Sequence, residues 1–430
     1  MGIKIGKKNI LYLLVTLFLL ADVRLFYLIP LPEKFTGPAA NKVFAAFVAV
    51  ISFGFYILFF NKLKFGYWGK WILSLYVIFL LSGIMSMINY RFTVTNVLWE
   101  HLTYFILLMY FPLTEYLSNE QAMERFISVA EIITDITCIL FLIQYFLWSG
   151  LDSVFLQLDD IITDFYIYRT YIPLRIYSVF EGFVRIFILM VAYRCIKNNF
   201  KKCKRDILSF ILMFMTIVFV DQSRVYLIIL LAAITYMILK QYGSRVSIKK
   251  LIIYFGGSIA AITLITTKLI SISTTIFSNE GSWWARLEAI AYYFSRILNH
   301  LIFGLGITIP EKTNSLYAYF KGEHGYYNFD DIGIFGVLFS VGIIGFTWYL
   351  LFTVKMIKTV HKTKKNRPLS MAITIVFILS FLSMSYLDKA RAMSLLMSMV
   401  VLDYNYRMSI KEKIYVFSDN NRLSDNRQFY

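Results

Sequence analysis

The stretch that decides the fold runs from Trp283 to Phe346. It begins WWARLEAIAYYFSRILNHLIFGLGI (283–307), continues through a polar loop to HGYYNFDD (324–331), and ends IGIFGVLFSVGIIGF (332–346). Its last part has the apolar character of a membrane-spanning helix, whereas the earlier parts gather arginines, carboxylates, histidines and tyrosines. Because an ionisable side chain at the centre of a membrane helix costs about 2.5–3.5 kcal/mol, such residues need a partner or a task.

The rest of the chain is built from apolar runs of membrane-spanning length. Of its 430 residues, 59% are hydrophobic and 16% are charged, and the mean hydropathy is +0.65. A soluble protein could not cover that much apolar surface. We therefore predict an all-α, polytopic integral membrane protein with about twelve transmembrane helices. The expected spans are 9–29, 42–60, 70–89, 100–117, 126–149, 176–194, 206–221, 224–240, 249–267, 331–354, 369–387 and 390–403.

The basic residues set the predicted orientation. The formal net charge is +17, and Lys and Arg cluster between alternate spans, as the positive-inside rule requires, which argues against a nucleic-acid partner. Both termini are expected in the cytoplasm of a multi-pass plasma-membrane protein, with a single transmembrane domain over 1–417 and a polar, disordered tail over 418–430. Two long loops, 150–175 and 268–330, are expected outside. The three cysteines fit free thiols rather than a disulfide framework.

Arg224 follows a tight connection, DQSR, between two apolar spans. In one interpretation this is a hairpin in which Asp221 and Ser223 cap the next helix and Arg224 pairs with Asp221. In the other, Arg224 is a fixed cation at the mouth of an outer cavity. The residues alone leave both interpretations open.

Arg286 lies in a predicted amphipathic helix of the outer loop, beside an apolar face and near Tyr293. Such an arginine can snorkel to lipid headgroups. We favour a role in binding a lipid-linked phosphate, because a guanidinium forms paired hydrogen bonds to phosphate oxygens. The residues assigned to the apolar face are Trp283, Leu287, Ile290, Phe294 and Ile297.

Asp330 and Asp331 stand where the outer loop enters the span after residue 331. Aspartate is a preferred helix N-cap, which would explain one of the two. A second carboxylate is surplus to capping and could act as a general base. His324, in the same loop, is an alternative base.

Further charges lie near other outer ends. Arg175 is at the rim of the segment PLRIYSVFEGFVR, in which Glu181 and Arg185 are spaced i,i+4 and can form a structural ion pair. The acidic run LDDIITD (158–164) is more simply a solvated loop than a site for a divalent cation. Asp22 and Arg24 either pair or face the cavity. A short outer loop, 388–391, is interpreted as setting topology only.

Several of these motifs resemble those of the O-antigen polymerase and ligase superfamily. In that family a Ser-Arg pair opens a span near the outer face, and an arginine-led amphipathic helix then ends in a GxG turn. A polar catalytic residue follows, ahead of a helix with two glycines near its end. The similarity covers about half of the chain, from Arg175 to Phe346. The matching residues are Ser223, Arg224, Arg286, Gly304, Gly306, Gly342 and Gly345. The usual proline before the GxG turn is absent.

The resemblance implies a metal-independent glycosyltransferase without a cofactor, which polymerises polyprenyl-diphosphate-linked repeat units at the outer leaflet. In that scheme Arg224 and Arg286 bind the diphosphate, and Asp330 or Asp331 is the base. Ligases carry a His-Asn pair at the position of the aspartates, so the polymerase branch is favoured. The implied partners are the lipid-linked glycan, membrane lipid and a chain-length regulator protein. The implied substrate-binding residues are Arg175, Glu181, Tyr293 and His324.

Two other activities remain open. A flippase for lipid-linked oligosaccharides would place polar residues along a path through the spans. The charges instead collect on the outer side, and the spans 207–220 and 225–239 carry none. A ligase-type transfer to another acceptor would use the same outer site.

Overall fold

The computed structural model describes residues 6–29, 40–60, 64–151, 153–156, 182–201, 203–221, 223–243, 281–310, 314–322, 325 and 327–425. Within these ranges every regular element is a helix, so the all-α prediction is confirmed. Six helices in the described ranges are long and apolar enough to cross a membrane, which supports a multi-pass membrane protein. They are α2 (Ala40–Phe60), α3 (Gly69–Tyr90), the continuous α4–η3–α5 run (Val94–Tyr116), α6 (Glu120–Leu151), α10 (Arg224–Tyr242) and α14 (Ile334–Lys362).

Further helices occupy most of the other predicted spans. The expected span 249–267 lies outside the described residues, so the total of twelve stays a prediction. The tail expected to be disordered from Ser418 is helical as far as Asp425, because residues 392–425 contain no Gly or Pro to end the helix. These helices are α1 (Lys7–Asp22), α8 (Val184–Lys197), α9 (Lys204–Thr216) with the π-turn η5 (Ile217–Asp221), α15 (Arg367–Leu379) and α16 (Ala392–Asp425).

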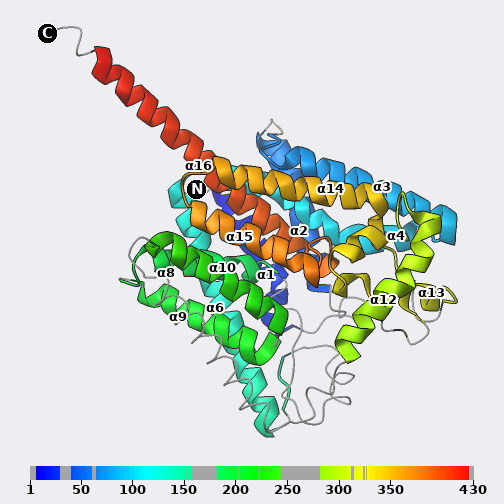
Figure 1. Ribbon diagram of the computed structural model, residues 1–430. Coiled ribbons are helices and arrows are strands. Elements are labelled where there is room, and N and C mark those ends of the chain that lie inside the picture. The colour runs from blue at the N-terminus through cyan, green and yellow to red at the C-terminus, as the bar shows by residue number, and fades with distance from the viewer. Residues whose placement is uncertain are drawn as a thin grey trace, which may run out of the picture.

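Helix α8 lies at the centre of the bundle. Every residue from Val184 to Tyr193 is buried, as expected for a helix surrounded by protein on all sides. Its neighbours are α9, α10, α15 and α16. In Figure 1, α14 runs beside α3, and α16 extends beyond the bundle.

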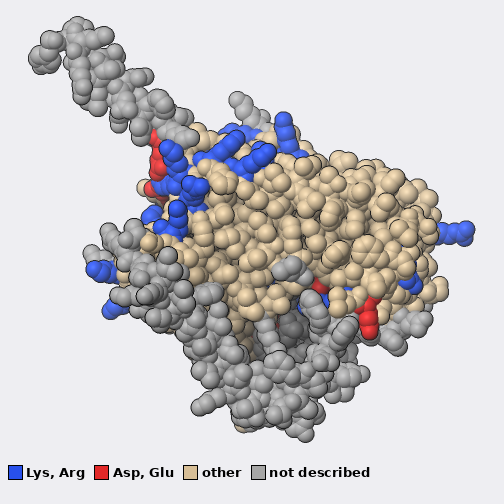
Figure 2. Space-filling model, in the orientation of Figure 1, with Lys and Arg blue, Asp and Glu red and all other residues tan. Residues whose placement is uncertain are grey.

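The two ends of the bundle differ in charge. We call the end where α1, α6 and α9 begin the basic end, and the opposite end, where α14 and α16 begin, the outer end. Figure 2 shows Lys and Arg gathered where α16 leaves the bundle, at the basic end. The positive-inside rule predicts that this end faces the cytoplasm.

Helix α14 is broken at Gly342, whose φ is 66°. The GLG turn that follows α12 (Gly281–Ile297) is hydrogen-bonded into this break. The Leu305 amide donates to the Phe339 carbonyl (2.7 Å), and in return the Ile343 amide donates to the Leu301 carbonyl (2.9 Å). A broken helix is tolerated in a membrane only where its freed backbone groups find such partners. Two motifs that the sequence showed separately therefore form one structural unit.

The close approach of the two backbones requires glycine. A Cβ at Gly304 (φ 76°) would lie 2.5 Å from the Gly342 nitrogen, and a Cβ at Gly342 would lie 2.3 Å from the Ile302 carbonyl oxygen. Gly306 (φ 98°) packs as tightly, because a Cβ there would lie 2.1 Å from Ser86 Oγ of α3. At Gly304 and Gly342 any larger side chain would require a backbone to move.

The amphipathic helix α12 packs on α13 (Tyr317–Lys321) and α14 through a second apolar cluster. Its inward face consists of Ala289, Tyr293 and Ile297, all at most 2% exposed. Of the predicted apolar face, Ile297 is buried in this cluster, whereas Leu287 and Phe294 are 41% and 44% exposed. Arg286 precedes Ala289 by three positions, so helical spacing aligns it with the inward face.

Candidate active site

Asp330 lies in a short 3-10 turn, η7 (Phe329–Asp331), at the outer end. Helix α14 begins after it, at Ile334, with Gly333 as its N-cap and no side-chain capping bond. Gly333 has a φ of 58°, and a Cβ there would lie 2.1 Å from the Phe381 carbonyl oxygen. The interpretation of Asp330 or Asp331 as the cap of this helix is therefore wrong, and both carboxylates need another explanation.

Asp330 meets the short connection between α15 and α16. Arg391 is 4% exposed, and its Nη1 donates to Asp388 Oδ2 (2.5 Å) and to the Asp330 carbonyl oxygen (3.3 Å). Asp388, 6% exposed, also accepts from the Ala390 amide (3.0 Å) and so caps the turn η9 (Lys389–Arg391). The interpretation of 388–391 as a loop that only sets topology is wrong, because two of its charges are buried against Asp330.

The surroundings of Asp330 raise its pKa above the usual value for an aspartate. Burial raises the pKa of Asp330, while the nearby cations of Arg391 and Lys321 act to lower it, and the Asp388 carboxyl lies within hydrogen-bonding reach. Burial also lowers the pKa of Lys321, against the attraction of three aspartates. A carboxyl group whose pKa is moved upward towards neutral pH suits the transfer of a proton.

The loop that contains Asp388 also contacts α4 and η3. Lys389 forms an ion pair with Glu100 of α4 (Val94–His101). Tyr104, in the 3-10 turn η3 (Leu102–Met109), donates its hydroxyl to the Leu387 carbonyl oxygen at 2.6 Å. Charges and hydrogen bonds from the α4–η3 run therefore fix the loop on which Arg391 approaches Asp330.

Arg185 of α8 lies deeper in the same region and is 1% exposed. Its guanidinium stacks over the Tyr226 ring at 4.2 Å, and its terminal nitrogens lie 3.7 and 3.8 Å from the Met384 sulfur. Among the described residues Arg185 pairs with no carboxylate, and its Nε has no hydrogen-bond partner. A buried cation with only a ring and a sulfur against it is electrostatically uncompensated.

Asp22 anchors the start of α8 beside this region. It forms a buried ion pair with Lys42 of α2, and its Oδ2 accepts from the Phe183 amide at 2.9 Å. A Cβ at Gly182 would lie 2.0 Å from that oxygen, so glycine is required for the approach. The ion-pair partner of Asp22 is thus Lys42, which the sequence interpretation did not consider.

The predicted diphosphate-binding arginines are only partly described. Arg286 is half-buried and has no hydrogen-bond or ion-pair partner in the part of the chain that the structure describes. Arg224 is the first residue of α10, and its side chain lies outside the description. Ser223 makes no capping bond to α10, so that part of the hairpin interpretation is wrong. Three predicted substrate-binding residues, Arg175, Glu181 and His324, and the acidic run 158–164 also lie outside the described residues.

Tyr293 was predicted to bind substrate, but its observed contacts are those of a packing residue. The side chain is fully buried, and its hydroxyl donates to the Phe320 carbonyl oxygen at 2.5 Å. Its ring lies 4.4 Å from the Phe329 ring, between centroids. Burial raises the pKa of Tyr293 well above the usual tyrosine range, so the hydroxyl stays neutral. These contacts fasten α12 to the segment that carries Asp330.

Comparison with known proteins adds no assignment. No protein-family model matches this sequence, and no curated protein matches it.

The structure adds three residues to the site that the sequence interpretation did not assign to it: Asp388, Arg391 and Lys321. One signal for the first two was present in the sequence. Asp388 and Arg391 stand i,i+3 in a very short connection between two apolar spans, where an internal ion pair has little reason to form for topology alone.

Proposed function

We propose that this protein polymerises polyprenyl-diphosphate-linked oligosaccharide repeat units into a surface polysaccharide by glycosyl transfer at the outer end. The observation that carries the proposal is Asp330, a carboxylate with a raised pKa that caps no helix and lies near the cations of Arg391 and Lys321. The resemblance of the surrounding motifs to O-antigen polymerases supplies the substrate class.

The chemistry needs one proton acceptor and several cations. An acceptor sugar hydroxyl attacks the anomeric carbon of the donor glycan, a new C–O bond forms, and the bond to the diphosphate oxygen breaks. Asp330 takes the hydroxyl proton, and polyprenyl diphosphate leaves as an anion. Arg286 and Arg224 stabilise that anion, because fixed guanidinium groups bind phosphate oxygens without any change in protonation. We assign the base to Asp330 and not to Asp331, because the side chain of Asp331 is exposed to solvent.

The buried charges of the basic end bear on the alternative of a flippase. Three carboxylates there are at most 4% exposed, and the sequence analysis had placed charges mainly on the outer side. Each forms an ion pair with an arginine: Glu131 with Arg205 at 3.1 Å, Asp206 with Arg194 at 3.2 Å, and Asp403 with Arg407 at 3.1 Å. Since a paired carboxylate is compensated in place, these residues fit a structural role better than a transport path.

The test compares Asp330→Asn with Asp331→Asn in the native cell, with lipid-linked glycans analysed by leaflet and length. Single repeats that accumulate on the outer leaflet only in Asp330→Asn support polymerisation. Repeats trapped on the cytoplasmic leaflet would indicate a flippase. Full-length polymer retained on the carrier would indicate a ligase. Unchanged glycans in Asp330→Asn would refute the proposed base.

A further inference from the structure

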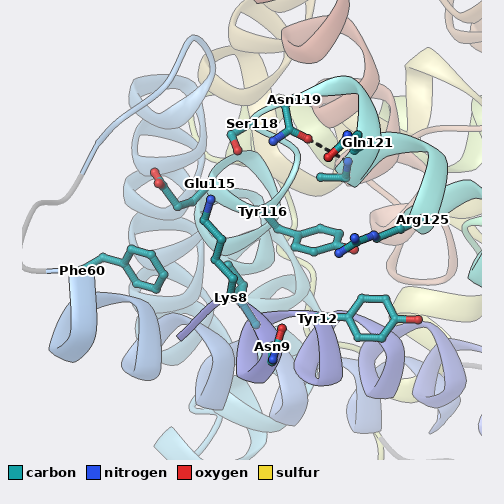
Figure 3. A pocket seen from close by; sticks show the side chains of 12 residues that line it. Lys8, Asn9, Tyr12, Phe60, Glu115, Tyr116, Ser118, Asn119, Gln121 and Arg125 are labelled. Carbon is teal, nitrogen blue, oxygen red and sulfur yellow. Dashed lines mark hydrogen bonds between the residues drawn. The ribbon is translucent and has the colours of Figure 1, made fainter. Parts of the chain in front are cut away.

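A pocket of about 560 Å³ opens at the basic end, the opposite end of the bundle from the start of α14. It lies between the start of α1, the end of α2, and the junction of α5 (Tyr110–Tyr116) with α6. Figure 3 shows the side chains that line it, among them Lys8, Tyr12, Phe60, Tyr116 and Arg125. The proposed glycosyl transfer makes no use of this pocket.

The pocket carries two uncompensated positive charges. Lys8 and Arg125 have no hydrogen-bond or ion-pair partner within the described chain, whereas the adjacent Lys7 donates to the Phe59 carbonyl oxygen at 2.9 Å. The one carboxylate in the lining, Glu115, is already paired with Lys64 at 3.1 Å. The lining therefore has a net positive charge and attracts an anion.

The pocket is also lined by uncharged polar groups that can donate hydrogen bonds. Tyr116 is 9% exposed, yet its hydroxyl has no hydrogen-bond partner in the described part of the protein. In Figure 3 its ring lies between Lys8 and Arg125, with the hydroxyl beside Arg125. The N-terminus of the 32-residue helix α6 also faces the pocket through Ser118 and Asn119. A helix N-terminus adds a partial positive charge.

The lining is amphipathic as well as basic. Tyr12 and Phe60 contribute aromatic surface beside the cations, and Leu11 contributes an aliphatic side chain. These apolar groups would not stabilise a free inorganic anion. A phospholipid matches the lining better, because its charged phosphate is next to glycerol and acyl carbons. Basic pockets between helices on the cytoplasmic side of a membrane bind anionic headgroups for this reason.

We propose that this pocket binds the phosphate headgroup of an anionic phospholipid from the cytoplasmic leaflet. Lys8 and Arg125 contact the phosphate oxygens, and the Tyr116 hydroxyl donates a hydrogen bond to one of them. The aromatic side chains pack against the glycerol and the upper acyl chain. A bound lipid then joins α1 to α6 at the basic end.

The test measures lipid retention by native mass spectrometry on the full chain in mild detergent, titrated with phosphatidylglycerol or with phosphatidylcholine. The protein should retain phosphatidylglycerol preferentially, and Lys8→Gln and Arg125→Gln should each weaken retention about fivefold. Tyr116→Phe, which keeps the ring, should show a smaller loss. Lys70→Gln is the matched control, because Lys70 is an exposed cation at the same end outside the pocket.

Three outcomes would overturn the proposal. The first is equal phosphatidylglycerol retention in Lys8→Gln, Arg125→Gln and Lys70→Gln. The second is complete displacement of the lipid by excess inorganic phosphate, which would assign the pocket to a free anion. The third is equal retention of phosphatidylcholine. Melting temperatures measured in phosphatidylcholine show whether each variant is folded. Within the described chain, Lys8, Arg125 and the Tyr116 hydroxyl have no hydrogen-bond or ion-pair partner to lose.

Discussion

Two buried ion pairs in this protein, Asp22–Lys42 and Asp388–Arg391, are built from similar groups but differ in balance. Asp22 pairs with Lys42, and its second oxygen accepts a backbone amide. Asp388 pairs with Arg391, but Asp330 and Asp331 add two further negative charges there, and Lys321 adds one positive charge.

The difference in charge balance suggests a structural role for the Asp22–Lys42 pair and a chemical role for the cluster around Asp330. A buried carboxylate with a matched cation contributes to specific packing. A carboxylate beside others meets repulsion from their charges, so its pKa rises, as that of Asp330 does. Removing a charge should therefore destabilise the fold at Asp22–Lys42 and inactivate the protein at Asp330.

The largest expected effect is on catalysis at the unbalanced cluster. Asp330→Asn removes the proposed base and should lower the rate of polymer formation about 10²–10⁴-fold. The measurement is polymer yield from purified protein and lipid-linked repeats. Asp331→Asn is the control and should stay near the wild-type rate, because its side chain is exposed. Similar rates in both variants would remove Asp330 from the reaction.

At the balanced pair the expected effect is on stability. Lys42→Met leaves the Asp22 carboxylate buried without its counter-charge, which should cost about 3–5 kcal/mol of unfolding free energy. Denaturant unfolding in micelles measures this loss. The double variant Asp22→Asn with Lys42→Met removes both charges and should recover most of the stability. A single variant as stable as the wild type would show that the pair is not structural.

The break in α14 lies in the helix that follows Asp330, and it has no part in the Asp22–Lys42 ion pair. Gly342→Ala places a Cβ 2.3 Å from the Ile302 carbonyl oxygen at a φ of 66°. Strain of this kind should cost about 1–3 kcal/mol and should reduce polymerisation more than it perturbs the Asp22–Lys42 region. Gly54→Ala is the matched control, since a Cβ there meets nothing within 4 Å. Hydrogen exchange resolved along the chain would locate the change, and equal effects of the two variants would contradict it.

The smallest expected effect is a displaced pH profile. Lys321 helps to lower the pKa of Asp330, so Lys321→Gln should raise that pKa further. The base is active only when ionised, and the acid limb of the pH–rate profile should therefore move to higher pH. Initial rates measured across a pH series in Lys321→Gln and in Lys70→Gln give the comparison. A limb that moved to lower pH would exclude Asp330 as the titrating group.

Local sequence patterns predicted the helices well, because apolar runs of span length have few alternatives in a bilayer. The start of α14 was predicted at 331 but lies at Ile334, since Gly333 must fit against Phe381. The apolar face of α12 was predicted from the sequence, but which of its residues point into the protein was not. Lipid tails are as apolar as a protein core, so Leu287 and Phe294 gave the same periodic signal as buried residues.

The composition of the site depended on distant pairing that no local pattern contains. Arg391 reaches the Asp330 carbonyl from 61 positions away, across the lengths of α14, α15 and their connections. Asp22 likewise meets the Phe183 amide across 161 positions. The sequence showed that one of the two aspartates is not needed to cap a helix. It did not show that Arg391 and Lys321 lie near Asp330.

The mutual hydrogen bonds between the GLG turn and α14 have a mechanical consequence. They join the turn after α12 rigidly to the outer half of α14. Hydrogen exchange at the Leu305 and Ile343 amides should therefore be slow. Arg286 lies on α12, and Asp330 lies just before the start of α14. The scaffold thus sets the spacing between Arg286, the proposed phosphate-binding residue, and Asp330, the proposed base.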